Sequence, residues 1–99
     1  MNQKAVFITY NQALHGLVQR LLEKLNQKGY TQWDGITGCG SLTGEPHLGS
    51  HAWPTLNGAL LVITDAQKVP ALLQGLREID QTAPKQGLRA FVWNVEDGV

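Results

Sequence analysis

The sequence has few charged residues, a single cysteine and no long apolar run. Lys plus Arg number 8 and Asp plus Glu number 8 in 99 residues, so the formal net charge at pH 7 is zero. A neutral chain lacks the long-range field that draws proteins to nucleic acid or to anionic membranes. A lone cysteine, Cys39, excludes an internal disulfide and favours a reducing compartment. We therefore expect a cytoplasmic protein that binds no nucleic acid.

Apolar stretches such as Ala5 to Tyr10 are too short for a membrane span or a signal-peptide core, so we expect no direct membrane insertion. A chain of 99 residues has a common size for one domain, and it buries roughly two-thirds of its extended surface on folding. Because neither an internal repeat nor a linker divides the sequence, one domain is expected over residues 1–99.

Hydrophobic periodicity predicts six elements in the order strand, helix, strand, strand, helix, strand. Strands are indicated by β-branched and aromatic residues, and helices by apolar residues at three- and four-residue spacing. The predicted strands are Lys4–Tyr10, Tyr30–Ile36, Gly58–Thr64 and Arg89–Val95. The predicted helices run from a cap at Asn11 to a left-handed stop at Gly29, and from about Gln67 or Lys68 through Ile79, with Pro70 in the first turn.

The second and third predicted strands each have an unusual local sequence. Gly35 interrupts the second strand and predicts a bend or a bulge before the loop that follows. The continuous apolar run Gly58 to Thr64 is typical of a central strand that is covered on both faces.

This order of elements predicts an α+β fold. Two helices that each connect a strand to another strand fit a βαββαβ sandwich, with a four-stranded antiparallel sheet and both helices on one face. The other sheet face is then bare, and its apolar residues, including two or three aromatics, need cover from other subunits. Trp33 and Trp93 lie in strands and are expected in the core or in such an interface. We therefore expect an oligomer.

The segment from Gly38 to Leu56 is longer than a strand connection needs. Irregular segments beyond roughly a dozen residues are often binding loops. Its first part, Gly38-Cys39-Gly40-Ser41, allows positive φ and close backbone approach, and such N–H groups can form an anion site for phosphate. The alternative is a bulge where the strand leaves the sheet. Arg89, just after Gly87, is a cation that can reach the same end of the sheet.

The same loop holds candidate metal ligands. Cys39, His47 and His51 carry the thiolate and imidazole groups that suit Zn or Cu, and Glu45 is close by. The His-x-x-x-His spacing converges on one ion only in a helix, which Gly49 disfavours, although a site shared between subunits avoids this objection. The alternative is a pair of solvent-facing histidines.

An enzyme has less support. Ser41, Ser50 and Cys39 lie in no nucleophile-elbow pattern, and His15 is expected to be exposed on the first helix. Asp34 and Glu45 flank the loop, and one hypothesis makes them an acid–base pair. The alternative, which is simpler, is that these carboxylates cap the backbone or are solvated. In the loop, Trp53 followed by Pro54 is expected to anchor the chain; stacking on a planar ligand is the alternative.

The chain resembles the P-II signalling superfamily, and within it a divergent P-II-like branch. The resemblance is carried by Trp33-Asp34-Gly35, Gly38-Cys39-Gly40-Ser41, Gly44-Glu45-Pro46-His47, Gly49-Ser50-His51-Ala52-Trp53-Pro54 and Gln86-Gly87-Leu88-Arg89-Ala90-Phe91-Val92-Trp93-Asn94. It implies a ferredoxin-like fold and a homotrimer with clefts between subunits that in P-II proteins hold adenine nucleotides.

Residue by residue, Gly38, Cys39, Gly40 and Ser41 fall where the family's loop base approaches nucleotide, and Arg89 falls where it has a phosphate-binding lysine. Gly87 belongs to a Gln-Gly-Leu sequence that replaces the family's Gly-Asp-Gly turn. The loop is also shorter than the family's loop and lacks its tyrosine. The superfamily includes the copper-linked trimer CutA and a branch associated with heavy-metal efflux. The resemblance therefore also favours Cys39, His47 and His51 as metal ligands.

Taken together, these features predict a trimeric, non-enzymatic regulator that binds a nucleotide or another small anion between subunits. The anion-binding candidates are Gly38, Cys39, Gly40, Ser41, Gly87 and Arg89. The candidates for contact with a partner, such as a membrane transporter, are Glu45, His47, His51 and Trp53. The alternative is a Cu- or Zn-binding or sensing protein that uses Cys39, His47 and His51.

Overall fold

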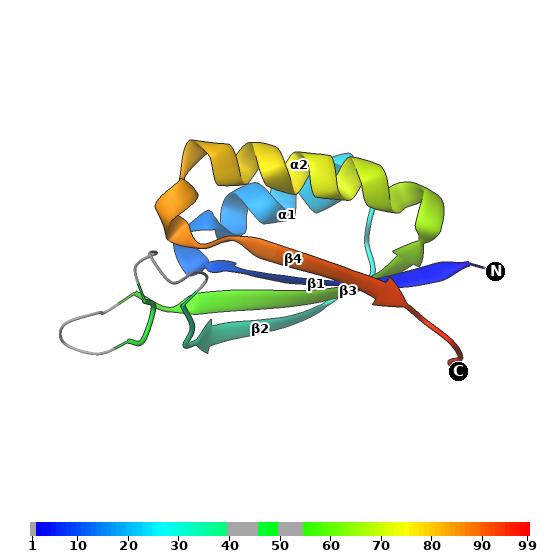
Figure 1. The fold of residues 1–99 in the computed structure, drawn as a ribbon, viewed down its shortest axis with the longest axis horizontal. Helices are drawn as coiled ribbons and strands as arrows, with labels where there is room; N and C mark the ends of the chain where they lie inside the picture. The colour runs from blue at the N-terminus through cyan, green and yellow to red at the C-terminus, as the bar shows by residue number, and fades with distance from the viewer. Residues whose placement is uncertain (1, 40–45, 50–54) are drawn as a thin grey trace.

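Four strands and two helices follow one another in the order βαββαβ (Figure 1). The structure is a computed structural model that describes residues 2–39, 46–49 and 55–99. The elements are β1 (Gln3–Asn11), α1 (His15–Lys24), β2 (Thr31–Ile36), β3 (Asn57–Asp65), α2 (Val69–Thr82) and β4 (Arg89–Asn94). Short 3₁₀ turns are η1 (Gln12–Leu14), η2 (Ala66–Lys68) and η3 (Pro84–Gln86). Among the described residues, no helix is long and apolar enough to cross a membrane.

The sheet has the strand order β2-β3-β1-β4, and every neighbouring pair is antiparallel. Both helices lie on one face of it (Figure 1). The predicted α+β class and the four-stranded antiparallel sheet are therefore confirmed. This is the ferredoxin-like arrangement that the resemblance implied.

The core fills the space between the sheet and the helices. Alternate residues of the central strands point toward the helices, as the two-residue period of a strand requires. The buried members are Val6, Ile8 and Tyr10 of β1, Leu60 and Val62 of β3, Val18 and Leu22 of α1, and Leu72 and Leu76 of α2. Burying a side chain of this size contributes roughly 1.5–3 kcal/mol, so this layer is the main source of stability.

The opposite sheet face is apolar and exposed. Phe7 pairs with Leu61 on one side and with Phe91 on the other, and its ring meets Trp33 edge-on at 6.5 Å between centroids. Phe91 is 62% exposed and Trp93 is 51% exposed. The expected bare face with aromatic residues is therefore present. In the isolated chain β3 is covered on one face only, because Ile63 is exposed on the other.

The first helix ends earlier than the sequence indicated. The predicted cap, Asn11, lies at the start of the 3₁₀ turn η1 that leads into the helix, where its side chain accepts a hydrogen bond from the Ala13 N–H at 2.9 Å. The helix α1 itself begins at His15 without a side-chain cap. Its left-handed residue is Asn26, with φ of 57°, and not Gly29. The Gln27 N–H bonds the Leu22 carbonyl at 2.8 Å across this turn, the pattern of a Schellman motif. Asparagine tolerates the left-handed region, so no glycine is needed.

Two other local predictions hold. The register of β2 against β3 shifts between Trp33 and Ile36, and Gly35 has φ of 62°, so the predicted irregularity lies at this glycine. Pro70 lies in the first turn of α2, where its missing N–H costs no hydrogen bond.

Candidate functional site

Several polar groups lie close together at one end of the sheet. Asn11, at the end of β1, lies opposite Asn57, at the start of β3. The Asn11 amide donates to Gln86 of η3, and the Gln12 N–H donates to the Leu56 carbonyl at 3.0 Å. These contacts tie the loop, β1 and the start of β4 together at one end of the molecule, the left end in Figure 1. We call it the loop end.

Gly38 closes the base of the loop. Its N–H donates to the His47 carbonyl at 2.8 Å, and the His47 N–H donates to the Gly38 carbonyl at 2.6 Å. A Cβ at position 38 would lie 2.5 Å from Nδ2 of Asn57, so a glycine is needed for this close approach. Because its N–H is already paired, Gly38 does not offer that donor to an anion.

His47 is buried against the start of β3. Its side chain is 1% exposed, and Nδ1 lies 2.5 Å from Oδ1 of Asn57. Because Oδ1 only accepts, this contact assigns the proton of the neutral ring to Nδ1 and makes Nε2 an acceptor. Nε2 is buried and has no hydrogen-bond partner among the described residues. A partner protein would reach this ring only after the loop had moved.

The other predicted loop residues divide into two groups. Cys39 is exposed next to the Gly38–His47 pairing. Gly40, Ser41, Glu45, His51 and Trp53 lie outside the described residues. Within residues 2–39, 46–49 and 55–99, no three His, Cys, Asp or Glu side chains converge on one point.

Arg89 lies at the loop end, as the sequence indicated, beside Gly87 in the left-handed conformation with φ of 73°. Its Nη1 donates to the Leu88 carbonyl at 2.6 Å and lies 4.0 Å from Oδ1 of Asp80. That Asp80 oxygen has no hydrogen-bond partner among the described residues, so the two side chains attract as ions without a hydrogen bond. Gly87 thus shapes the turn, and Arg89 supplies the charge.

A hollow of about 200 Å³ separates α2 from β4 at this point. Its wall includes Arg77 as well as Arg89 and Asp80, so it has two cations and one carboxylate. Arg77 was not among the candidate residues predicted from the sequence. The available indication was its place three residues before Asp80, beside the buried stripe of α2, but only the packing of β4 against that helix brings it near Arg89.

His15 is not simply exposed on the first helix. Nδ1 of its ring lies 2.8 Å from the Tyr10 hydroxyl, and the two rings stack with centroids 6.0 Å apart. Asp34, the other candidate acid–base group, is exposed on an edge strand and accepts a hydrogen bond from Gln32 at 2.7 Å. The carboxylate is therefore a solvated group.

Burial of Tyr10 makes the free energy of unfolding depend on pH in the alkaline range. Burial, with smaller effects from the Asp34 carboxylate and Tyr30, raises the pKa of Tyr10 from 10.0 to about 12. A raised pKa means that the unfolded chain loses this proton first, so stability present below pH 10 is lost as the pH rises toward 12. Urea unfolding of wild type between about pH 8 and about pH 11 should show a loss of about 1.4 kcal/mol from this group. In Tyr10→Phe, the free energy of unfolding should fall over the same pH range by that much less than in wild type. Equal falls in the two proteins would contradict the raised pKa of Tyr10.

No family model and no curated protein matches the chain, but solved structures do. CPII from Thiomonas intermedia K12, a nitrogen regulatory PII-like protein bound to ADP, AMP and bicarbonate, matches with a TM-score of 0.80 and 19% identity, over 100% of this chain and 91% of that one. A putative PII-like signalling protein from Thermus thermophilus matches with a TM-score of 0.68 and 26% identity, over 96% and 88%.

A third match is the ATP complex of GlnK from B. subtilis, with a TM-score of 0.72 and 13% identity over 99% of this chain and 85% of that one. All three matches cover at least 96% of this chain. The chain therefore has the fold of the P-II-like proteins.

Proposed function

We propose that the protein is a non-catalytic regulator that binds an adenine nucleotide, or another small anion, at the loop end of its sheet. The observation that carries the proposal is the hollow beside the loop end, where Arg77 and Arg89 face the same space. Two guanidinium groups against one carboxylate leave an excess of positive charge, which favours an anionic ligand. The structural neighbour CPII was solved with ADP, AMP and bicarbonate, and GlnK with ATP.

Arg89 suits a phosphate-binding role. A guanidinium has five N–H donors in a planar fork, and the bond to the Leu88 carbonyl uses one of them. Asp80 holds the group near α2 without a hydrogen bond at the facing oxygen, so a phosphate can compete for it. Gly40 and Ser41 remain proposed contributors from the loop base, with Cys39 beside them.

The proposed assembly is a homotrimer with the exposed sheet faces turned inward. Trp33, Phe91 and Trp93 make this face strongly apolar, and a patch of this kind in water favours association. Subunits that meet there would form clefts at their edges. In the proposed trimer, the Arg77–Arg89 hollow opens into such a cleft.

The loop would carry the signal. Its base is tied to β3 through the Gly38–His47 pairing and the contact of His47 with Asn57. A ligand changes the loop only if it binds two loop states with different affinity. We propose that Glu45, His51 and Trp53 contact the regulated protein, for example a membrane transporter, and that His47 fixes the loop base.

Calorimetric titration with ATP, ADP and AMP tests the proposed ligand. We expect binding of at least one nucleotide, and a loss of about tenfold or more in affinity in Arg89→Gln, because a charged hydrogen bond contributes about 1.5–3 kcal/mol. Arg20→Gln is the matched control, since Arg20 is exposed on α1. Absence of heat at millimolar nucleotide, or equal loss in both variants, would contradict the proposal.

A second candidate function is Zn or Cu binding by Cys39, His47 and His51. It is favoured by the His47 ring, because a histidine that ligates a metal commonly donates its other ring N–H to an oxygen acceptor, as His47 does to Asn57. Zinc titration of untagged protein should then show a site that weakens at least tenfold in His47→Gln but not in His15→Gln. Unchanged zinc affinity in the triple variant Cys39→Ser/His47→Gln/His51→Ala would exclude these ligands.

A further inference from the structure

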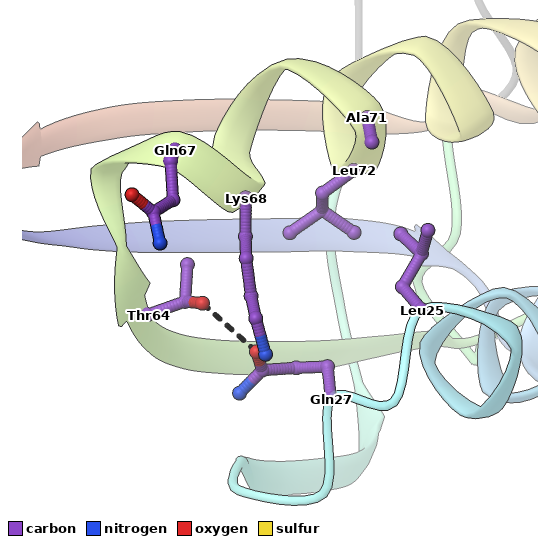
Figure 2. A pocket seen from close by; sticks show the side chains of 7 residues that line it. All are labelled: Leu25, Gln27, Thr64, Gln67, Lys68, Ala71 and Leu72. Atoms are coloured by element: carbon purple, nitrogen blue, oxygen red, sulfur yellow. Dashed lines mark hydrogen bonds between the residues drawn. The ribbon is translucent and has the colours of Figure 1, made fainter.

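A separate cavity lies at the end of the sheet opposite the loop. It has a volume of about 200 Å³ and lies between the C-terminal end of α1 and the start of α2 (Figure 2). Thr64, near the end of β3, forms its floor, whereas Asn57, at the loop end, is at the start of the same strand. The full lining is Leu25, Gln27, Thr64, Gln67, Lys68, Ala71 and Leu72. The nucleotide site proposed above uses none of these residues.

The wall of this cavity divides into an apolar part and a polar part. Leu25, Ala71 and Leu72 supply the aliphatic surface on one side. On the other side, Figure 2 shows the Lys68 side chain extending from η2 across the cavity toward the Gln27 amide, with Thr64 beside it. Among the described residues that line the cavity, Lys68 is the only charged one. An apolar pocket with a few convergent polar groups is typical of a small-molecule site.

The hydrogen bonds in the polar part of the wall leave N–H donors of Gln27 and Lys68 unused. Thr64 is 5% exposed, and its hydroxyl donates to Oε1 of Gln27 at 2.9 Å. Nε2 of Gln27 donates one hydrogen to the Gly29 carbonyl at 3.0 Å. The Gln27 amide is therefore fixed in orientation, with its acceptor turned to Thr64 and a second amide hydrogen for another acceptor. The three ammonium hydrogens of Lys68 add donors on the same side.

We propose that this cavity binds a small aliphatic monocarboxylate. The carboxylate would accept hydrogen bonds from Lys68 Nζ, and the aliphatic part would contact Leu25, Ala71 and Leu72. The volume is below the roughly 300 Å³ at which pockets for drug-sized molecules begin, so the ligand is a short or branched chain, such as butyrate or isovalerate, and not a nucleotide. The site is independent of the Arg77–Arg89 hollow.

Two-dimensional ¹H–¹⁵N NMR of the full chain, titrated with isovalerate, tests this site. We expect saturable shifts of the Thr64 and Ala71 backbone amides and of the Gln27 side-chain amide. Isovaleramide has the same shape without the charge and should bind at least about tenfold more weakly, because it loses a charge-assisted hydrogen bond. The same loss is expected for isovalerate in Lys68→Gln, whereas Lys85→Gln, an exposed lysine in η3, should bind as wild type does.

A second variant separates the cavity from the charge. Ala71→Phe places a ring in the cavity at an exposed helical position, so the chain should fold while isovalerate binding is lost. Saturable binding that Ala71→Phe abolishes and Lys68→Gln weakens supports the proposal. It is overturned if isovalerate causes no shifts at Thr64, Ala71 and Gln27 at millimolar concentration, if isovaleramide binds equally well, or if Ala71→Phe binds as wild type does. Titration of the same variants with ATP, ADP and AMP measures the proposed nucleotide site at the loop end, so failure of one proposal can be distinguished from failure of the other.

Discussion

Replacement of Gly58 with valine is expected to lower the free energy of unfolding by about 3 kcal/mol. A Cβ at this position would lie 3.1 Å from Cε2 of Tyr10 and 3.2 Å from its hydroxyl oxygen. Tyr10 pairs with Gly58 across β1 and β3, is fully buried, and is held by the His15 ring. The aromatic ring cannot withdraw without opening the core, and the two methyl groups of valine increase the overlap.

Urea unfolding at neutral pH measures this effect, and alanine substitutions provide a graded series. Gly58→Ala should cost about 1 kcal/mol, because the ring needs to move by a few tenths of an ångström. Gly16→Ala is the matched control: its nearest neighbour is the flexible Arg20 guanidinium at 3.5 Å, and alanine in a helix gains up to about 1 kcal/mol over glycine. A stable Gly58→Val protein would show that Tyr10 does not pack against β3 in this way.

The fold could be predicted because burial follows periodicity. Each strand and helix carries its apolar residues at the spacing of one buried face, so the pattern of Val6, Ile8 and Tyr10 already specifies which side of β1 meets the helices. The end of α1 could not be predicted in the same way. Asn26 and Gly29 both tolerate a left-handed turn, and the choice depends on the hydrogen bond from Gln27 to Leu22, which only the folded chain shows.

The loop base illustrates a different limit of sequence reasoning. A Gly-x-Gly sequence suggests free N–H groups, but the Gly38 donor is used by His47, nine positions later. That pairing arises because Asn57 receives the His47 ring, so the role of Gly38 depends on three segments at once. Arg77 was missed for a related reason, since its proximity to Arg89 depends on how β4 packs beside α2. Local pattern identifies candidates, whereas tertiary pairing decides which groups remain available.

Replacement of Phe91 with aspartate is expected to dissociate the proposed trimer. Phe91 is the most exposed aromatic residue of the bare sheet face, next to Phe7 and on the same side as Trp93. Burial of one such side chain contributes roughly 1.5–3 kcal/mol per subunit, and a carboxylate in its place would lose solvation in the interface. Association should weaken by roughly hundredfold or more. Light scattering after size-exclusion chromatography should give three times the 10.9 kDa chain mass for wild type and the single-chain mass for Phe91→Asp.

The matched control is Leu17→Asp, which places the same charge at an exposed apolar position on α1, away from the bare sheet face. This variant should remain trimeric. Because Phe91 is exposed in the isolated chain, Phe91→Asp should keep its far-ultraviolet circular dichroism, so that loss of assembly is distinguished from loss of fold. A wild-type protein at the single-chain mass would exclude the trimer. A trimeric Phe91→Asp variant would show that subunits meet on another surface.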